Sequence, residues 1–181
     1  MNTRQLTAIC RRMMPAVALC AALTLSPVAQ AQVEQKPFVV PELQTWRGGE
    51  GTFTPTSSAR VVYAGGNEAR ITASRFAASY KELTGMELAV VKGKPRQGDF
   101  AFVQRKKKGE ADESYTLRIS NQVVAGAHDL RGLQWAASTL LQLTRQDVAL
   151  PQGEAVDAPR YAMRGFMMDC GGKFIPMSYV R

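Results

Sequence analysis

The sequence predicts an α+β fold in which a mostly antiparallel sheet carries two helices on one face. Several short segments alternate apolar and polar residues, as half-buried strands do, and two longer segments repeat apolar residues at helical spacing. A nearly all-apolar run at residues 163–169 is typical of a strand covered on both faces. Because this run follows the linker-like Asp157-Ala158-Pro159, we expect it to belong to a different structural unit.

The first 31 residues have the pattern of a cleavable secretion signal. Three arginines without an acidic residue are followed by an apolar stretch over residues 13–25 and then by the small-residue pattern Ala29-Gln30-Ala31. The stretch is shorter than the about 20 residues of a membrane-spanning helix, which argues against an anchor. We therefore expect an exported protein, periplasmic or extracellular after cleavage near Ala31, with no stable membrane anchor.

Cleavage changes the charge and the cysteine count. The full chain has a net charge of +8, and loss of the three arginines in residues 1–31 lowers it to +5. Of the three cysteines only Cys170 remains, so neither an internal disulfide nor a cysteine zinc cluster is expected. The basic run Arg105-Lys106-Lys107-Lys108 is interpreted as a hairpin tip rather than a nucleic-acid patch, because acidic residues follow it at once.

The first half of the expected domain contains short β-like pieces and one helix. Phe38-Val39-Val40 and Thr52-Phe53-Thr54 flank a glycine-rich stretch, and Arg60-Val61-Val62-Tyr63 is typical of a strand. The helix is expected between Asn67, as its N-cap, and Gly85, as its C′ residue. Its buried face is predicted to comprise apolar residues spaced three and four apart: Ala69, Ala73, Phe76, Ala77, Tyr80 and Leu83.

The second half is expected to hold four strands and a second helix. The strands are predicted over residues 87–91, 100–103, 115–119 and 123–127. Asp129 is the expected N-cap of the second helix. The buried stripe of that helix is predicted to be Leu133, Ala137, Leu140 and Leu141, with Leu130 and Trp135 nearby.

This α+β region shows no catalytic constellation, which would require converging groups such as a nucleophile with its base or a pair of carboxylates. His128 is the only histidine, and its spacing identifies no partner, so we interpret it as a turn residue beside the N-cap. Gly65-Gly66 and Gly171-Gly172 are interpreted as turn glycines, because they lack the pattern of a phosphate loop. No cofactor and no metal site are expected.

A more specific motif follows the linker. Residues 159–169 read Pro-Arg-Tyr-Ala-Met-Arg-Gly-Phe-Met-Met-Asp, and Lys173-Phe174-Ile175-Pro176 come shortly after. This string resembles the segment that opens the catalytic barrel of family 20 glycoside hydrolases, the β-N-acetylhexosaminidases. The helical segment at 132–143 resembles the end of the N-terminal domain of that family. The family's Arg-His position reads Gly172-Lys173 here, a departure from the pattern.

The resemblance implies a division of the chain into a signal peptide at 1–31, a hexosaminidase-like α+β domain at 32–155 and the start of a truncated TIM barrel, the (β/α)8 fold, at 156–181. It also implies removal of terminal β-linked N-acetylhexosamine by substrate-assisted hydrolysis, for which the family uses an Asp–Glu pair. That pair lies on a later barrel strand, so no catalytic residue is expected in this chain, which alone would be inactive.

The resemblance further implies substrate contacts. Arg164 matches the family arginine that clamps sugar hydroxyls, and a guanidinium fork suits vicinal oxygens. Asp169 matches an aspartate at the end of the first barrel strand, as a substrate contact or as a structural partner. The implied partners are N-acetylhexosamine-containing glycans such as chitin, peptidoglycan or glycoprotein glycans, with no nucleic acid. A stand-alone exported module that binds carbohydrate or peptidoglycan without catalysis remains the alternative.

Overall fold

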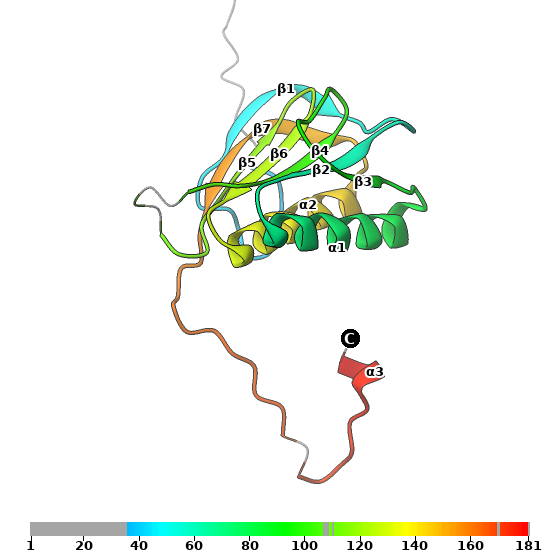
Figure 1. The fold of residues 1–181 in the computed structure, drawn as a ribbon. Helices are drawn as coiled ribbons and strands as arrows, with labels where there is room; N and C mark the ends of the chain where they lie inside the picture. The colour runs from blue at the N-terminus through cyan, green and yellow to red at the C-terminus, as the bar shows by residue number, and fades with distance from the viewer. Residues whose placement is uncertain (1–35, 107–108, 110, 170, 181) are drawn as a thin grey trace, which may run out of the picture. The chain divides into compact units, whose positions relative to one another are not determined.

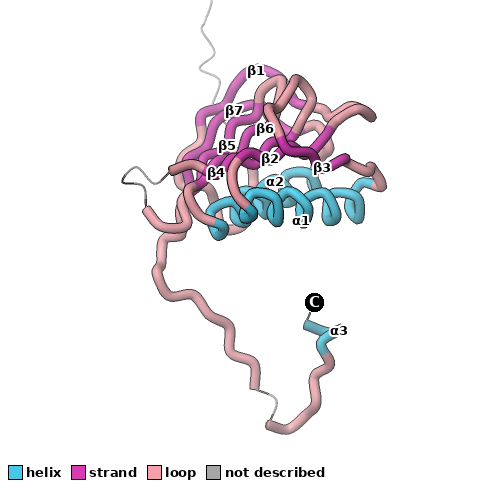
Figure 2. The backbone as a smooth tube through the Cα atoms, in the orientation of Figure 1, coloured by secondary structure: helices cyan, strands magenta, loops and turns pink. Residues whose placement is uncertain are grey.

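The computed structural model describes residues 36–106, 109, 111–169 and 171–180, so the expected signal peptide lies outside the described residues. These residues form a mixed α+β fold, with a sheet and two long helices (Figures 1 and 2). No helix of the described ranges is both long and apolar enough to cross a membrane.

The sheet of the described region has seven strands in the order β1-β7-β5-β6-β4-β2-β3. Strands predicted at 60–63, 100–103, 115–119 and 123–127 are confirmed, and the one predicted at 87–91 lies slightly later in the chain. The strand bounds are β1 Arg47–Phe53, β2 Arg60–Ala64, β3 Ala89–Lys92, β4 Phe100–Gln104, β5 Tyr115–Ile119, β6 Val123–Ala127 and β7 Leu150–Asp157.

The expectation of a mostly antiparallel sheet is wrong, because the sheet is mixed. The β1/β7, β7/β5 and β5/β6 pairs are antiparallel, whereas β6/β4, β4/β2 and β2/β3 are parallel. One parallel pair follows from helix α1, which connects β2 to β3 as a crossover. The alternation of apolar residues shows which face of a strand is buried but does not choose its neighbour.

The hairpin expected around the basic run does not form. Strands β4 and β5 flank this run, yet they are not neighbours in the sheet. Each of them pairs with β6, which lies between them and runs parallel to β4 and antiparallel to β5. The hydrophobic pattern of two consecutive strands was compatible with either arrangement, and the later strand β6 takes the central place.

Helix α1, Asn67–Thr84, ends as predicted at Gly85, whose φ of 75° lies in the left-handed region that glycine adopts at low cost. Its N-cap is Gly66 rather than Asn67, and the Asn67 side chain instead accepts hydrogen bonds from Arg70. Of the predicted apolar face only Leu83, at 37%, is exposed. The α1 boundary therefore differs from the prediction by one residue at the start.

Helix α2, Leu130–Gln146, begins after Asp129 as predicted, and the Asp129 carboxylate accepts the Gly132 N–H at 2.7 Å. Figure 1 shows α1 and α2 side by side on one face of the sheet, which confirms the expected layering. Their buried faces meet the inner face of the sheet around a cluster of packed aromatic rings: Phe53, Phe76, Tyr80, Phe100 and Phe102.

Strand β7 was not predicted, because Pro151 and Gly153 lie within it and both residue types are depleted in strands. Its place between β1 and β5 gives it partners on both sides, which overrides this low propensity. The strand expected at 163–169 does not form, and its large apolar side chains are exposed. A strand without neighbours leaves its backbone groups unpaired, so this segment stays irregular up to the short helix α3, Met177–Val180.

Candidate functional site

The most unusual backbone position in the described chain is Glu113, just before β5. It has a φ of 62°, the only positive value among the described residues other than glycine. Its N–H donates to Asp129 Oδ2 at 2.9 Å, so the N-cap residue of α2 also holds the backbone of this loop. Left-handed conformations of this kind cost energy and concentrate at sites where a side chain must be aimed.

Three side chains donate to the Glu113 carboxylate. The Trp135 indole Nε1 donates to Oε2 at 2.9 Å, Arg131 Nη1 donates to Oε1 at 3.1 Å, and Arg164 Nη2 also donates to Oε2. Trp135 and Arg131 come from the first turns of α2, whereas Arg164 comes from the irregular segment after β7. The Glu113 side chain is largely buried under these donors. We call Glu113, Arg131 and Trp135 the Glu113 cluster.

The donors around Glu113 favour the ionised form of its carboxylate. The hydrogen bond from Trp135 is the largest influence that lowers the pKa of Glu113 below its ordinary value. Burial acts in the opposite direction, and the hydrogen bonds from Arg131 and Arg164 add to the lowering. The net result is a carboxylate that stays ionised at neutral pH and presents a fixed negative charge at the start of α2.

The beginning of α2 approaches this loop closely because residue 132 is glycine. A Cβ placed on Gly132 would lie 2.5 Å from the Ser114 carbonyl oxygen and 2.8 Å from Ala127 Cβ. Such distances are too short for a side chain, so glycine lets α2 rest directly on the backbone next to Glu113. The donors Arg131 and Trp135 are thereby brought within reach of the carboxylate.

A groove of about 420 Å³ lies next to the Glu113 cluster. It runs between α2 and two other segments, residues 40–42 and 157–161, and its lining is mostly apolar. Gln142 of α2 holds the first of these segments by accepting the Val40 N–H at 2.8 Å and donating to the Val40 carbonyl at 3.0 Å. Trp135, at 40% exposure, forms part of the groove wall.

The structure places the two site residues expected from sequence in different surroundings. Arg164 lies on the Glu113 cluster, with its guanidinium carbon 5.7 Å from the Trp135 ring centroid, and donates to the Tyr161 carbonyl. Asp169 accepts the Gly171 N–H at 2.7 Å, a contact inside its own turn. The sugar-binding roles of both residues stay predictions. Glu113 itself was missed, because no sequence pattern marks a lone glutamate in a loop.

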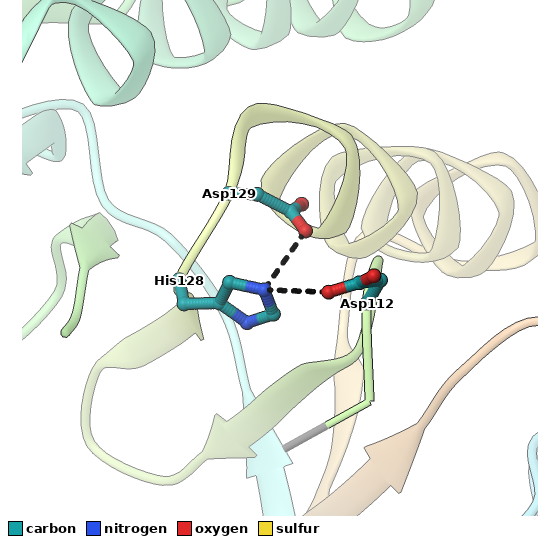
Figure 3. Close-up of side chains that lie close together, drawn as sticks. All are labelled: Asp112, His128 and Asp129. Carbon is teal, nitrogen blue, oxygen red and sulfur yellow. Dashed lines mark ion pairs between the residues drawn. The ribbon is translucent and has the colours of Figure 1, made fainter. Parts of the chain in front are cut away.

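His128 has neighbours that its spacing in the sequence did not reveal (Figure 3). Its Nε2 lies 3.1 Å from Asp129 Oδ2 and 3.6 Å from Asp112 Oδ1. One imidazole and two carboxylates are a set that can bind a metal ion, and their ligand atoms lie within 4.8 Å of one another. However, one Asp129 oxygen already accepts the Gly132 N–H and the other the Glu113 N–H. We therefore interpret this group as the structural support of the α2 N-terminus.

The comparison with known families agrees with this fold. The sequence model described as glycosyl hydrolase family 20, domain 2, matches residues 36–158, which is well over half of the chain. The chain therefore belongs to glycosyl hydrolase family 20, and the resemblance expected over about residues 38–181 is confirmed at the level of the family.

Particular relatives can be named. The chain is similar to lacto-N-biosidase from Bifidobacterium bifidum, with 29% identity over 135 residues that cover 72% of this chain and 12% of that protein. The fold is similar to that of the GH20 exo β-N-acetylglucosaminidase from Vibrio harveyi in complex with N-acetylglucosamine, with a TM-score of 0.64, 19% identity and coverage of 79% and 22% of the two chains.

The β-N-acetylhexosaminidase from Bacteroides fragilis is also similar in fold, with a TM-score of 0.62 and 21% identity. The match covers 79% of this chain and 29% of that one. At these identities the solved structures show that the α+β fold is shared. The chain spans less than a third of the length of each of these relatives.

Proposed function

We propose that this chain is the N-terminal portion of an exported β-N-acetylhexosaminidase, which removes terminal β-linked N-acetylhexosamine by substrate-assisted hydrolysis. In this proposal residues 36–158 are an accessory domain, and the Asp–Glu pair lies on a catalytic barrel encoded after residue 181. The family match over these residues is the observation that carries the proposal. Relatives named as lacto-N-biosidase and β-N-acetylhexosaminidase support a glycan substrate that contains N-acetylhexosamine.

The chemistry of the described carboxylates supports an accessory role for the domain. A general acid or a residue that orients an acetamido group needs a carboxyl oxygen open to the substrate. Glu113 and Asp129 instead accept hydrogen bonds from donors of their own domain. Asp99, which is buried, is bound by Arg60 and by the Arg96 N–H. These three groups stabilise the fold, and in this proposal catalysis belongs to the Asp–Glu pair of the barrel.

Arg164 is the residue that we propose to contact the substrate. Its planar guanidinium can donate two parallel hydrogen bonds to neighbouring sugar hydroxyls, which a lysine cannot do. The arginine follows the last strand of the domain at the position where the family motif opens the barrel. Asp169, five residues further on, would then lie near the end of the first barrel strand.

The proposal is tested on the full product of the gene that encodes this chain. Reading the frame beyond residue 181 should reveal an Asp–Glu pair, and the full product should release nitrophenol from 4-nitrophenyl N-acetyl-β-glucosaminide or the galactosaminide. Arg164→Lys should lower kcat/KM by about tenfold or more, because it removes donors to the sugar. Arg118→Lys, on an exposed strand position away from the linker, is the matched control and should leave kcat/KM unchanged.

Two outcomes would overturn the proposal. One is a reading frame that lacks the Asp–Glu pair, and the other is a full product without activity on both nitrophenyl substrates. Retention of the isolated 181-residue chain on insoluble chitin or peptidoglycan, combined with either outcome, would favour the stand-alone binding module.

A further inference from the structure

The surroundings of the Arg164 guanidinium have the three features of a guanidinium-binding site. The Glu113 carboxylate accepts from Nη2, the Tyr161 carbonyl accepts from Nη1, and the Trp135 ring lies 5.7 Å from the guanidinium carbon. A carboxylate supplies charge, a carbonyl supplies a second acceptor, and an aromatic face attracts a cation. The Arg164 side chain is 39% exposed, so the contact lies at the edge of the domain.

Most of this site is built by the α+β domain without help from Arg164. The Glu113 backbone is held by Asp129, and its carboxylate is oriented by Arg131 on one oxygen and by Trp135 on the other. Both donors are anchored on the first turns of α2. A site whose groups are already in place binds its ligand with less loss of conformational freedom.

The negative charge of the Glu113 carboxylate also favours a cationic ligand. Glu113 forms an ion pair with Arg131, whose side chain is 72% exposed and therefore neutralises the carboxylate only in part. The Asp112 and Asp129 carboxylates lie in the same loop region, beside His128. A second guanidinium next to Glu113 adds a second positive charge beside this carboxylate.

We propose that the Glu113 cluster is a guanidinium-binding site of the α+β domain, and that its ligand is the side chain of Arg164 in the same chain. Binding fixes the linker at residues 158–164 along the N-terminal part of α2. This role requires no catalytic activity and holds for the 181-residue chain by itself.

If the proposed function is correct, Arg164 has two alternative partners, Glu113 and a sugar. This consequence rests on the proposed function. While its guanidinium is bound to Glu113, Arg164 is held at the edge of the α+β domain and does not reach a sugar bound in a separate barrel. Glu113 then holds the arginine and its linker until the barrel is present to receive them. Because the tests below use the 181-residue chain without sugar, their failure would leave the proposed function standing.

The first test measures trypsin cleavage after position 164 in the folded chain by intact mass spectrometry. Each rate is divided by the rate on a peptide of residues 158–169 that has the same residue at position 164. Glu113→Gln should increase the relative rate roughly fivefold, because the ion pair that protects Arg164 is lost. Arg164→Lys should increase it by a similar factor, because an ammonium cannot replace the fork and its contact with Trp135.

Glu154→Gln is the matched control for Glu113→Gln, since it removes a glutamate whose ion pair with Arg118 is exposed. It should leave the relative rate unchanged. Unaltered far-ultraviolet circular dichroism and a cooperative melting transition well above the assay temperature establish that each variant remains folded. Equal rates for the wild type and Glu113→Gln would overturn the proposal. Full protection in Arg164→Lys would show that attraction between charges alone holds residue 164, and would overturn the guanidinium site.

The second test supplies the ligand from outside. In Arg164→Gln the site is vacant, so N-methylguanidinium should change the fluorescence of Trp135 in a saturable manner at millimolar concentrations. The same titration of the wild type and of the double variant Glu113→Gln/Arg164→Gln should give no saturable change. A saturable response that persists without Glu113, or the lack of one in Arg164→Gln, would contradict the proposal.

Discussion

The Trp135 indole donates a hydrogen bond of 2.9 Å to the Glu113 carboxylate and thereby connects helix α2 to the loop before β5. The two residues are 22 positions apart in the sequence. Glu113 faces the cations Arg131 and Arg164, and its backbone is held by Asp129. The contact therefore unites the N-terminal part of α2, the loop and the linker.

The first prediction concerns the pH dependence of this contact. Because Trp135 and the two arginines lower the pKa of Glu113, the stabilisation they provide is complete above the ordinary pKa of 4.5. It is lost as the pH falls through the lower pKa of the folded state. Trp135 fluorescence should thus be constant from neutral pH down to about 4.5 and should change only below it.

Two variants isolate that signal. Glu113→Gln should abolish the acid transition of Trp135, and Trp135→Phe supplies the background from Trp46, the other tryptophan. A transition centred above the ordinary pKa of a glutamate would show that burial outweighs the donors, contrary to our expectation.

The second prediction concerns the ion pair between Arg60 and Asp99. Asp99 is only 2% exposed and accepts Arg60 Nη2 at 2.6 Å, the Arg60 N–H at 3.2 Å and the Arg96 N–H at 2.8 Å. Asp99→Asn should lower the free energy of unfolding by about 2–4 kcal/mol, since the buried partner of a charged group is lost. Urea denaturation measures the change.

Burial raises the pKa of Asp99, but the hydrogen bonds from Arg60 and Arg96 outweigh it and hold the pKa below the ordinary value. The contribution of this pair should accordingly be lost in acid, and Asp99→Asn should flatten the acid limb of stability against pH. Glu154→Gln, which breaks the exposed pair with Arg118, is the control and should cost less than about 1 kcal/mol. Equal losses in the two variants would refute the prediction.

The third prediction compares two buried tyrosines. Tyr115 donates its hydroxyl to Asp157 Oδ2 at 2.8 Å and lies 2.7 Å from Thr139 Oγ1, whereas the Tyr80 hydroxyl has no hydrogen-bond partner among the described residues. Tyr115→Phe should destabilise the domain by about 1–3 kcal/mol, because it leaves two polar partners unsatisfied. Tyr80→Phe should be neutral or stabilising, because it removes a buried hydroxyl that costs free energy.

Thermal melting and urea denaturation of the two variants provide the measurement. Burial also raises the pKa values of both tyrosines, so neither should ionise below the pH of alkaline unfolding. A loss for Tyr80→Phe as large as that for Tyr115→Phe would show that the Tyr80 hydroxyl has a partner in solution.

The fourth prediction concerns the approach of α2 to the Glu113 loop. Gly132→Ala would place a Cβ 2.5 Å from the Ser114 carbonyl oxygen, so the helix must move. We expect a loss of about 1–3 kcal/mol in unfolding free energy. The matched control is Gly165→Ala, where an added Cβ meets nothing within 4 Å, and it should leave stability unchanged. An unchanged stability in Gly132→Ala would exclude a tight contact between α2 and this loop.

The elements that were predicted correctly depend on local features of the sequence. The Asp129 cap and the Gly85 terminus act within one helical turn, and strands β5 and β6 carry their own alternation of apolar residues. Such features work through backbone conformation and solvent exposure, which neighbouring residues in the chain decide. They were therefore available before any fold was known.

The candidate site could not be predicted in the same way. Glu113, Trp135 and Arg164 meet across separations of 22 and 51 residues. None of them belongs to a motif that requires the others, and only Arg164 was singled out, by family resemblance. Their contact depends on Gly132, which allows α2 to approach the loop, and on the path of the linker after β7.

By itself, the sequence determined where the two helices lie, which of their faces are buried and to which family the chain is related. The tertiary structure alone decided that the sheet is mixed, that β7 lies between β1 and β5, and that Arg164 lies on Glu113. The physical reason is that capping and hydrophobic periodicity are local. The choice of strand neighbour and the convergence of distant charges depend instead on the packing of the whole domain.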